Sequence, residues 1–150
     1  MTDRPVLAAI DLTDAETAGT VIRQAAIEAE IRSAPLAAVA VVPALFTGLD
    51  WRYAIRGTHK APPPEERRKL LKDTLERLVE LVADETASDI ETNTYALTGA
   101  VHERVLATAA ELGARLIVIA AADTQTKSDD LGPNAVRVAR HAKCPVLLVR

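Results

Sequence analysis

VLAAIDLTDAE, residues 6–16, decides the fold class. The apolar run over residues 6–10 is typical of a buried strand, and a helical pattern begins almost directly after it. Thr13 and Glu16 have capping-box spacing, which predicts a helix over about 14–31 with the Thr13 hydroxyl as its cap. A buried strand that leads at once into an amphipathic helix is the repeating unit of an α/β protein.

The same alternation continues along the chain. Further apolar runs predict buried strands at residues 36–42, 116–120 and 146–149. Helical patterns lie between them at about 64–82, 101–112 and 132–142, with Gly113 as a C-terminal cap. Residues 90–97 alternate polar with apolar and predict a half-exposed strand at a sheet edge. The expected fold is α/β: one doubly wound domain over 1–150, with a mostly parallel sheet and helices on both faces.

Composition narrows the function classes. Hydrophobic residues make up 49% of the chain but aromatic residues only 3%, so the core must be built from Ala, Val, Ile and Leu. A net charge of −3 argues against a nucleic-acid partner, which usually requires a basic face. No apolar run approaches the roughly 20 residues that span a bilayer, and the first residues lack a signal-peptide layout. We therefore expect no membrane insertion and a cytoplasmic location.

Four stretches together resemble the universal stress protein family: VLAAIDLTDAE (6–16), AVAVVP (38–43), TAAELGARLIVIA (108–120) and GPNAVRVARHAKCPVLLVR (132–150). They occur in the family's order and cover nearly the whole chain. The resemblance implies a five-stranded sheet in the order 3-2-1-4-5. It also implies a stress or signalling role without established catalysis.

A homodimer is expected on two grounds. The resemblance implies homodimers that often form through the last strand. Residues 146–149 are strongly apolar and would lie at a sheet edge, and exposed apolar edges readily pair with another chain. The predicted interface consists of Val146, Leu147, Leu148 and Val149.

The implied strand order places a switch point between the first and fourth strands, where ligands of open α/β sheets bind. The resemblance implies a vestigial nucleotide site there, formed by Asp11, the main chain of Val41, Ala120, Gly132 and Asn134. Asp11 has an equally good structural interpretation, because an aspartate that ends a strand often caps the next turn.

The phosphate-binding part of the family pattern is altered. Family members that bind ATP resemble Gly-x-x-Gly, then a loop, then Gly followed by Ser or Thr, so that backbone N–H groups approach the phosphates. Here Asp123 and Thr126 stand at the two glycine positions, the loop is one residue shorter, and Gly132 is followed by Pro133. Proline removes both a hydroxyl and a backbone donor. We expect no cofactor; ATP or AMP is possible but disfavoured.

Other chemistry-bearing residues favour plain interpretations. The three histidines, His59, His102 and His141, lack metal-ligand spacing, and no nucleophile, P-loop or dinucleotide motif is present, so no catalytic or metal site is predicted. Cys144 is the single cysteine, which excludes an intramolecular disulfide, and it is interpreted as a small buried hydrophobe rather than a redox thiol.

The segment that leads into the second helix, together with the start of that helix, has a high positive charge. Residues 52–72 carry seven basic and two acidic side chains, a local charge of +5 in an acidic chain. A solvated helix face with its preceding loop explains this, and a docking patch for an acidic partner, anchored by Trp51 and Tyr53, is the functional alternative. Residues 44–64 lack periodicity and are expected to form a mobile loop that could cover the crevice.

These observations favour a non-catalytic, dimeric regulatory binding protein of the stress response that does not bind ATP and acts through an unknown protein partner or small ligand. The first alternative is a nucleotide switch, responding to ATP or AMP, that uses the altered site. The second alternative is a weak ATPase with Asp11, Asp123 and Asp129 around a metal ion; three carboxylates alone do not define such a site.

Overall fold

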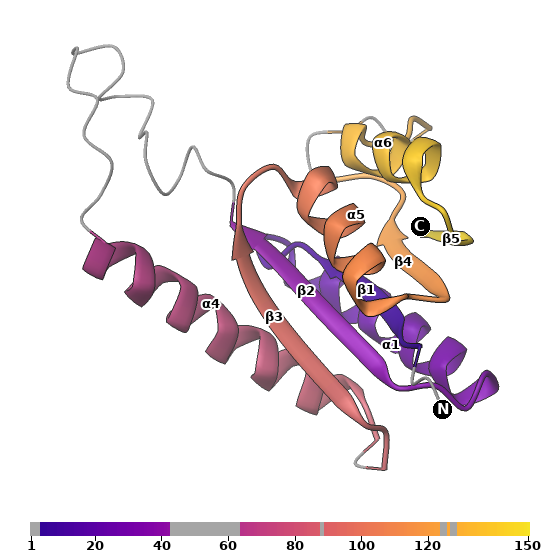
Figure 1. Ribbon diagram of the computed structural model, residues 1–150, viewed down its shortest axis with the longest axis horizontal. Helices are drawn as coiled ribbons and strands as arrows, with labels where there is room; N and C mark the ends of the chain where they lie inside the picture. The colour runs from indigo at the N-terminus through magenta and orange to yellow at the C-terminus, as the bar shows by residue number, and fades with distance from the viewer. Residues whose placement is uncertain (1–3, 43–63, 88, 124–125, 127–128) are drawn as a thin grey trace.

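The computed structural model describes residues 4–42, 64–87, 89–123, 126 and 129–150. Strands and helices alternate along these residues (Figure 1). In chain order they are β1 Val6–Ile10, α1 Ala15–Ile31, β2 Leu36–Val42, α4 Pro64–Glu85, β3 Thr92–Thr98, α5 Val101–Leu112, β4 Leu116–Ala120, α6 Pro133–His141 and β5 Val146–Val149.

The five strands form one parallel sheet in the order β3-β2-β1-β4-β5, which confirms the predicted fold class and strand order. β1 lies in the centre, paired in parallel with β2 and β4, and all of its residues are buried. β3 forms one edge, as its polar–apolar alternation predicted, and β5 forms the other, as the resemblance implied. Helices α1 and α4 cover one face of the sheet, and α5 and α6 cover the other (Figure 1).

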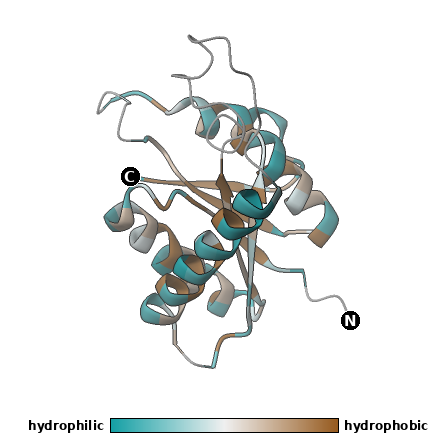
Figure 2. Ribbon diagram, turned by 90° about the vertical axis from the view of Figure 1, so that its left-hand side faces the viewer, coloured by the Kyte–Doolittle hydropathy of each residue, from teal (hydrophilic) through white to brown (hydrophobic). Residues whose placement is uncertain are grey.

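The core consists of two apolar layers, one on each face of the sheet. Alternate residues of β1 supply them: Val6 points toward α1 and α4, and Leu7 points toward α5 and α6. Many of the remaining core residues are alanines, which allow the helices to pack closely on the strands. Figure 2 shows the apolar sides of the helices turned toward the sheet and the polar sides turned outward.

The start of α1 differs from the prediction. Asp14, not Thr13, is the N-cap: its carboxylate accepts hydrogen bonds from the amide of Thr17 at 3.2 Å and the hydroxyl of Thr17 at 2.6 Å. The Thr13 hydroxyl donates a hydrogen bond to Asp11 Oδ1, and the cap contacts of α1 are made by Asp14. At the end of α5 the prediction is confirmed, because Gly113 adopts the left-handed conformation with φ 62°.

The start of strand β3 and the buried face of helix α4 also differ from the prediction. The half-exposed strand begins at Thr92 rather than Ile90. In α4 the inner face is formed by Thr74, Leu78 and Val82. Helical spacing predicts one apolar face that contains Leu71, Leu75, Leu78 and Val82, but Leu75 is 36% exposed. The helix is rotated so that Leu75 lies at the rim of the buried stripe.

Several predictions fall outside the described residues. They concern the mobile loop over 44–64 with Trp51, Tyr53 and His59, and the basic residues at 52, 56 and 60. None of the helices in the described parts of the chain is long and apolar enough to cross a membrane.

Candidate functional site

The carboxyl ends of β1 and β4 lie side by side where the strand order reverses. Backbone hydrogen bonds bring the start of α6 to this point: the Gly132 amide donates to the Ala121 carbonyl at 2.7 Å, and the Ala121 amide donates to the Val149 carbonyl at 2.7 Å. Ala120 ends β4 beside them and is half-buried. The structure thus brings Ala120 and Gly132 together at the switch point, as predicted.

Asp11 follows β1 and is exposed. Its Oδ1 atom accepts hydrogen bonds from the Thr13 amide at 2.9 Å and the Thr13 hydroxyl at 2.6 Å. Arg77 of α4 donates to the neighbouring Leu12 carbonyl at 3.0 Å. These contacts stabilise the turn between β1 and α1, so the structural interpretation of Asp11 accounts for its observed contacts.

Val41 lies in the part of β2 that extends beyond β1. The ladder between these strands ends at the pair Ile10 and Ala40, while β2 remains paired with β3 through Val42. The main chain of Val41 on the β1 side therefore has no partner in β1 and lies near the switch point. Its side chain is half-buried and packs on the core layer beneath α5 and α6.

The residues at the two altered glycine positions, Asp123 and Thr126, are hydrogen-bonded to each other. The Thr126 hydroxyl donates to Asp123 Oδ1 at 2.6 Å, and the Thr126 amide donates to the Asp123 carbonyl at 3.2 Å. The Asp123 amide in turn donates to the Thr126 hydroxyl at 3.3 Å. The two backbone donors at these positions already have partners within the chain, and a bound phosphate would have to displace them.

The start of α6 is tightly packed. Gly132 is buried, and a Cβ atom added there would lie 3.3 Å from Thr126 Oγ1 and 3.4 Å from the Asp123 amide nitrogen. Pro133 occupies the first turn and offers no N–H group. Gly132 caps the helix without a side-chain hydrogen bond, so the amides of Asn134 and Ala135 have no partner within the helix.

The charge around the loop is negative among the described residues. Asp123, Asp129 and Asp130 are all exposed there. Within the described residues no group of three or more histidines, cysteines or acidic residues could hold a metal ion, and this covers His102 and His141. Asp11, Asp123 and Asp129 are therefore not gathered into the metal site that a weak ATPase would need.

Cys144 precedes β5 and is half-buried rather than fully buried. Burial raises the pKa of its thiol, and the nearby Arg4 only partly offsets this effect. A raised pKa keeps the thiol protonated at neutral pH, which agrees with its interpretation as a small hydrophobe.

Two open depressions lie at the opposite end of the sheet, where sequence reasoning predicted no site. One, of about 290 Å³, lies between the end of α1 and the residues before β3, with Glu30, Asp89 and Glu91 in its lining. The other, of about 260 Å³, lies between α1 and the end of α4. Both are formed by helix ends and turns that are distant in sequence, a juxtaposition that periodicity does not reveal.

These features define a class: a doubly wound α/β domain with its candidate ligand site at the crevice where the strand order reverses. The sequence model of the universal stress protein family matches residues 3–150. The chain therefore belongs to the universal stress protein family.

Individual relatives agree with this assignment. Universal stress protein G of Shigella flexneri is 37% identical over 75 residues, which cover 50% of this chain and 53% of that protein. The chain thus matches about half the length of such curated relatives.

Two solved structures match over nearly all of both chains. The universal stress protein from Archaeoglobus fulgidus in complex with dAMP has a TM-score of 0.67 at 23% identity and covers 100% of both chains. A universal stress protein in complex with cAMP has a TM-score of 0.65 at 18% identity, covering 100% of this chain and 98% of that chain. At these identities the likeness is one of fold.

Proposed function

We propose that this protein is a non-catalytic regulatory binding protein of the stress response and that it does not use ATP. The observation that carries the proposal is the hydrogen bonding between Asp123 and Thr126 at the switch point. The amides of Asp123, Thr126 and Gly132 all donate within the chain, to Thr126, Asp123 and Ala121 respectively. A triphosphate would therefore meet three backbone donors that already have partners within the chain.

Electrostatics act in the same direction. A carboxylate and a phosphate about 6 Å apart repel each other by roughly 1–3 kcal/mol at effective dielectric constants between those of a protein surface and water. Asp123, Asp129 and Asp130 are exposed beside the crevice. We therefore expect Mg-ATP to bind no better than roughly millimolar, about 4 kcal/mol of standard free energy.

A nucleoside monophosphate is the second candidate ligand, and it would make the protein a nucleotide switch. The start of α6 favours a monophosphate ligand. The amides of Asn134 and Ala135 have no partner within the helix and lie at the positive end of its dipole. A single phosphate could accept hydrogen bonds from these two amides without breaking the hydrogen bonds between Asp123 and Thr126. The ligands named for the two structural relatives, dAMP and cAMP, are both monophosphates.

Isothermal titration of Mg-ATP, AMP and cAMP into the same protein separates these proposals. Weak binding of all three supports a regulator that acts through another ligand or a protein partner, and micromolar AMP or cAMP with weak ATP supports the switch. Micromolar ATP, or phosphate release above a protein-free control, contradicts the proposal. The triple variant Asp123→Gly, Thr126→Gly and Pro133→Ser is expected to gain ATP affinity, while Asp89→Gly at the opposite end of the sheet serves as a charge control.

We also propose a homodimer through β5. This strand pairs with β4 on one side, and its four residues are half-buried. Antiparallel pairing with a second β5 would cover Val146, Leu147, Leu148 and Val149. Sedimentation velocity at micromolar concentration should detect a dimer that Leu148→Lys weakens, with a thermal melt to verify that the variant folds. A wild-type monomer under these conditions would contradict the interface.

A further inference from the structure

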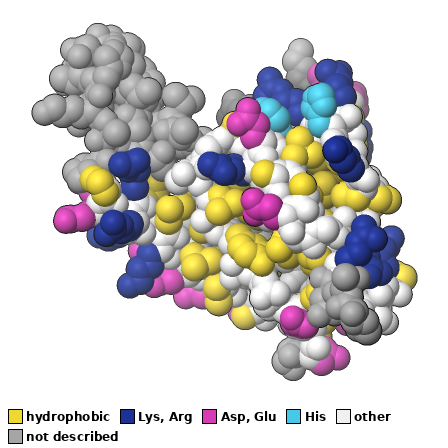
Figure 3. Space-filling view, in the orientation of Figure 1, with side chains coloured by type: hydrophobic (Ala, Val, Ile, Leu, Met, Phe, Trp, Pro, Cys, Tyr) yellow, Lys and Arg dark blue, Asp and Glu magenta, His cyan; other side chains and the backbone are white. Residues whose placement is uncertain are grey.

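One side of α4 carries an ordered sequence of exposed groups. Six residues of this flank run from basic through apolar to acidic at helical spacing: Lys69, Lys72, Leu75, Glu76, Val79 and Glu80. The exposed Asp73 lies at the border of the flank and departs from this order. Leu75 is 36% exposed and Val79 47% exposed, whereas the opposite side of the helix holds the core contacts. Figure 1 shows the first half of α4 extending away from the sheet, and Figure 3 shows basic side chains gathered over its start.

Contacts within the chain do not account for these charges. Between described residues, the ion pairs within 4 Å are Arg23 with Glu85 and Arg32 with Glu28, and neither involves the charged residues of this flank. The α4 flank, residues 69–80 on this side, is therefore complementary to itself when turned end for end.

We propose that the α4 flank binds the same flank of a second copy of this chain, with the two helices antiparallel about a two-fold axis near Leu75. Lys72 of one copy then lies opposite Glu76 of the other, and Lys69 lies opposite Glu80, on the same side of the apolar stripe. Symmetry repeats both contacts, and Leu75 and Val79 fill the centre. The antiparallel arrangement also places opposite ends of the two helix dipoles together.

This contact differs from the proposed β5 dimer. It lies beside β3, at the opposite edge of the sheet from β5. Two different two-fold contacts on one chain link dimers into larger assemblies. The exposed surface on the α4 flank is one helix wide, so the association is weak, and because it depends on charge it weakens as salt is added.

Charge reversal tests the pairing. The acidic variant carries Lys69→Glu and Lys72→Glu, and the basic variant carries Glu76→Lys and Glu80→Lys. Each variant repels its own copies at every contact, so its self-association should weaken about tenfold relative to the wild type. Mixed together, the two variants regain complementary charges at all of these contacts, and their mixture should associate at least as strongly as the wild type.

The measurement is sedimentation velocity over a micromolar concentration range at low and high salt, on each protein alone and on the mixture. Thermal melts verify that both variants fold, and any β5 dimer is common to every sample and cancels in the comparison. The matched control places the same charge changes on exposed positions of α5 and α6: Arg137→Glu with Arg140→Glu, mixed with Glu103→Lys and Glu111→Lys.

Three results support the proposal: association of the flank mixture above either variant alone, little association of the control mixture, and weakening when Leu75→Ala is added to the flank mixture. Two results would overturn it. One is a flank mixture no heavier than its components, which would leave the flank as a solvated surface or a site for another acidic or basic partner. The other is a control mixture that associates equally well, which would show attraction between net charges alone.

Discussion

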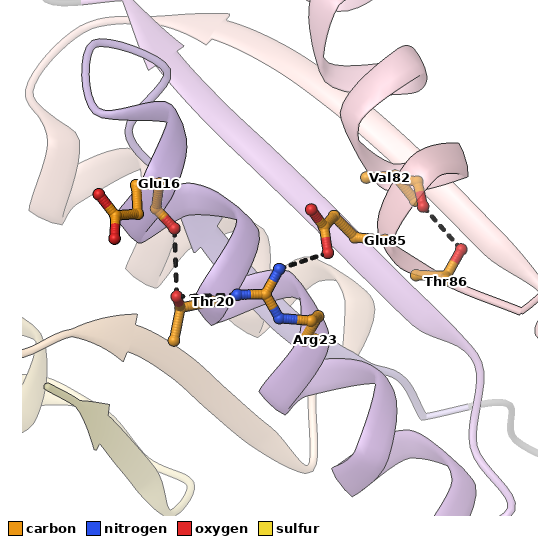
Figure 4. A network of polar contacts seen from close by, with 6 residues as sticks. All are labelled: Glu16, Thr20, Arg23, Val82, Glu85 and Thr86. Carbon is orange, nitrogen blue, oxygen red and sulfur yellow. Dashed lines mark hydrogen bonds and ion pairs between the residues drawn. The ribbon is translucent and has the colours of Figure 1, made fainter.

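A glycine in the middle of α1 provides a sharp test of how α1 and α4 are joined. Gly19 is buried beneath an ion pair in which Arg23 Nη1 lies 2.6 Å from Glu85 Oε2 of α4 (Figure 4). Arg23 also donates to the Thr20 hydroxyl at 3.1 Å. A Cβ atom at Gly19 would lie 3.0 Å from Glu85 Oε1 and 3.4 Å from Arg23 Nη1. Replacement by alanine would therefore press directly on the link between the two helices.

The expected effect follows from two opposing terms. Alanine is favoured over glycine inside a helix by roughly 0.5–1 kcal/mol. Displacing Glu85 sacrifices much of an ion pair whose side chains are 53% and 23% exposed, which is worth at most about 1 kcal/mol after solvent screening. Gly19→Ala alone should therefore change the free energy of unfolding by about zero. In a Glu85→Ala background, where the space is empty, the same substitution should stabilise the protein by roughly 0.5–1 kcal/mol.

Urea unfolding of the wild type, both single variants and the double variant measures this coupling. Glu85→Gln is the control, because it removes the ion pair but keeps the shape: with that opposing term gone, Gly19→Ala should stabilise this background as well. An equal effect of Gly19→Ala in all three backgrounds would refute the reasoning, since it would mean that Glu85 does not occupy the space above Gly19.

Three further predictions concern single positions. Leu78→Ala should destabilise by about 2–5 kcal/mol in urea unfolding, whereas the matched, rim-exposed Leu75→Ala should cost less than half as much; equal costs would contradict the assignment of the inner face of α4. Hydrogen bonds from Thr17 lower the pKa of Asp14 below 3.8, so its stabilising effect is present above pH 3.8 and is lost as pH falls through the lower folded value. The difference in urea midpoint between the wild type and Asp14→Ala should shrink over that acidic range, while Asp14→Asn keeps a cap without this pH dependence; a constant difference would exclude the cap. Because burial raises the pKa of Cys144, its alkylation at neutral pH should be slower than that of a free thiol and should accelerate with pH; rapid labelling at neutral pH would be inconsistent with this.

The place of the candidate site in the fold was predictable, but the hydrogen bonds within it were not; ligand binding there stays a prediction. Strand order and the start of α6 placed Ala120 and Gly132 at the switch point, and the structure brings them there. The sequence also identified Asp123 and Thr126 as departures from the family's glycines. It could not show that these two side chains bond to each other, because hydrogen-bond partners in a loop depend on its backbone path rather than on periodicity.

The sequence by itself determined the kinds of elements, their order, the buried central strands and the half-exposed edge strand β3, because these properties depend on local apolar periodicity. It located Gly113, where a positive φ requires glycine, but it missed Asp14, since Thr13 fits the same local pattern and only the backbone path shows that Asp14 accepts from the Thr17 amide. Tertiary structure alone decided how α4 is rotated on the sheet. Leu75 and Leu78 are indistinguishable by type and similar in phase, and packing against β2, β3 and α1 buries one and leaves the other at the rim. The same packing brings Arg23 to Glu85 across 62 residues, a distance over which no sequence pattern specifies a partner.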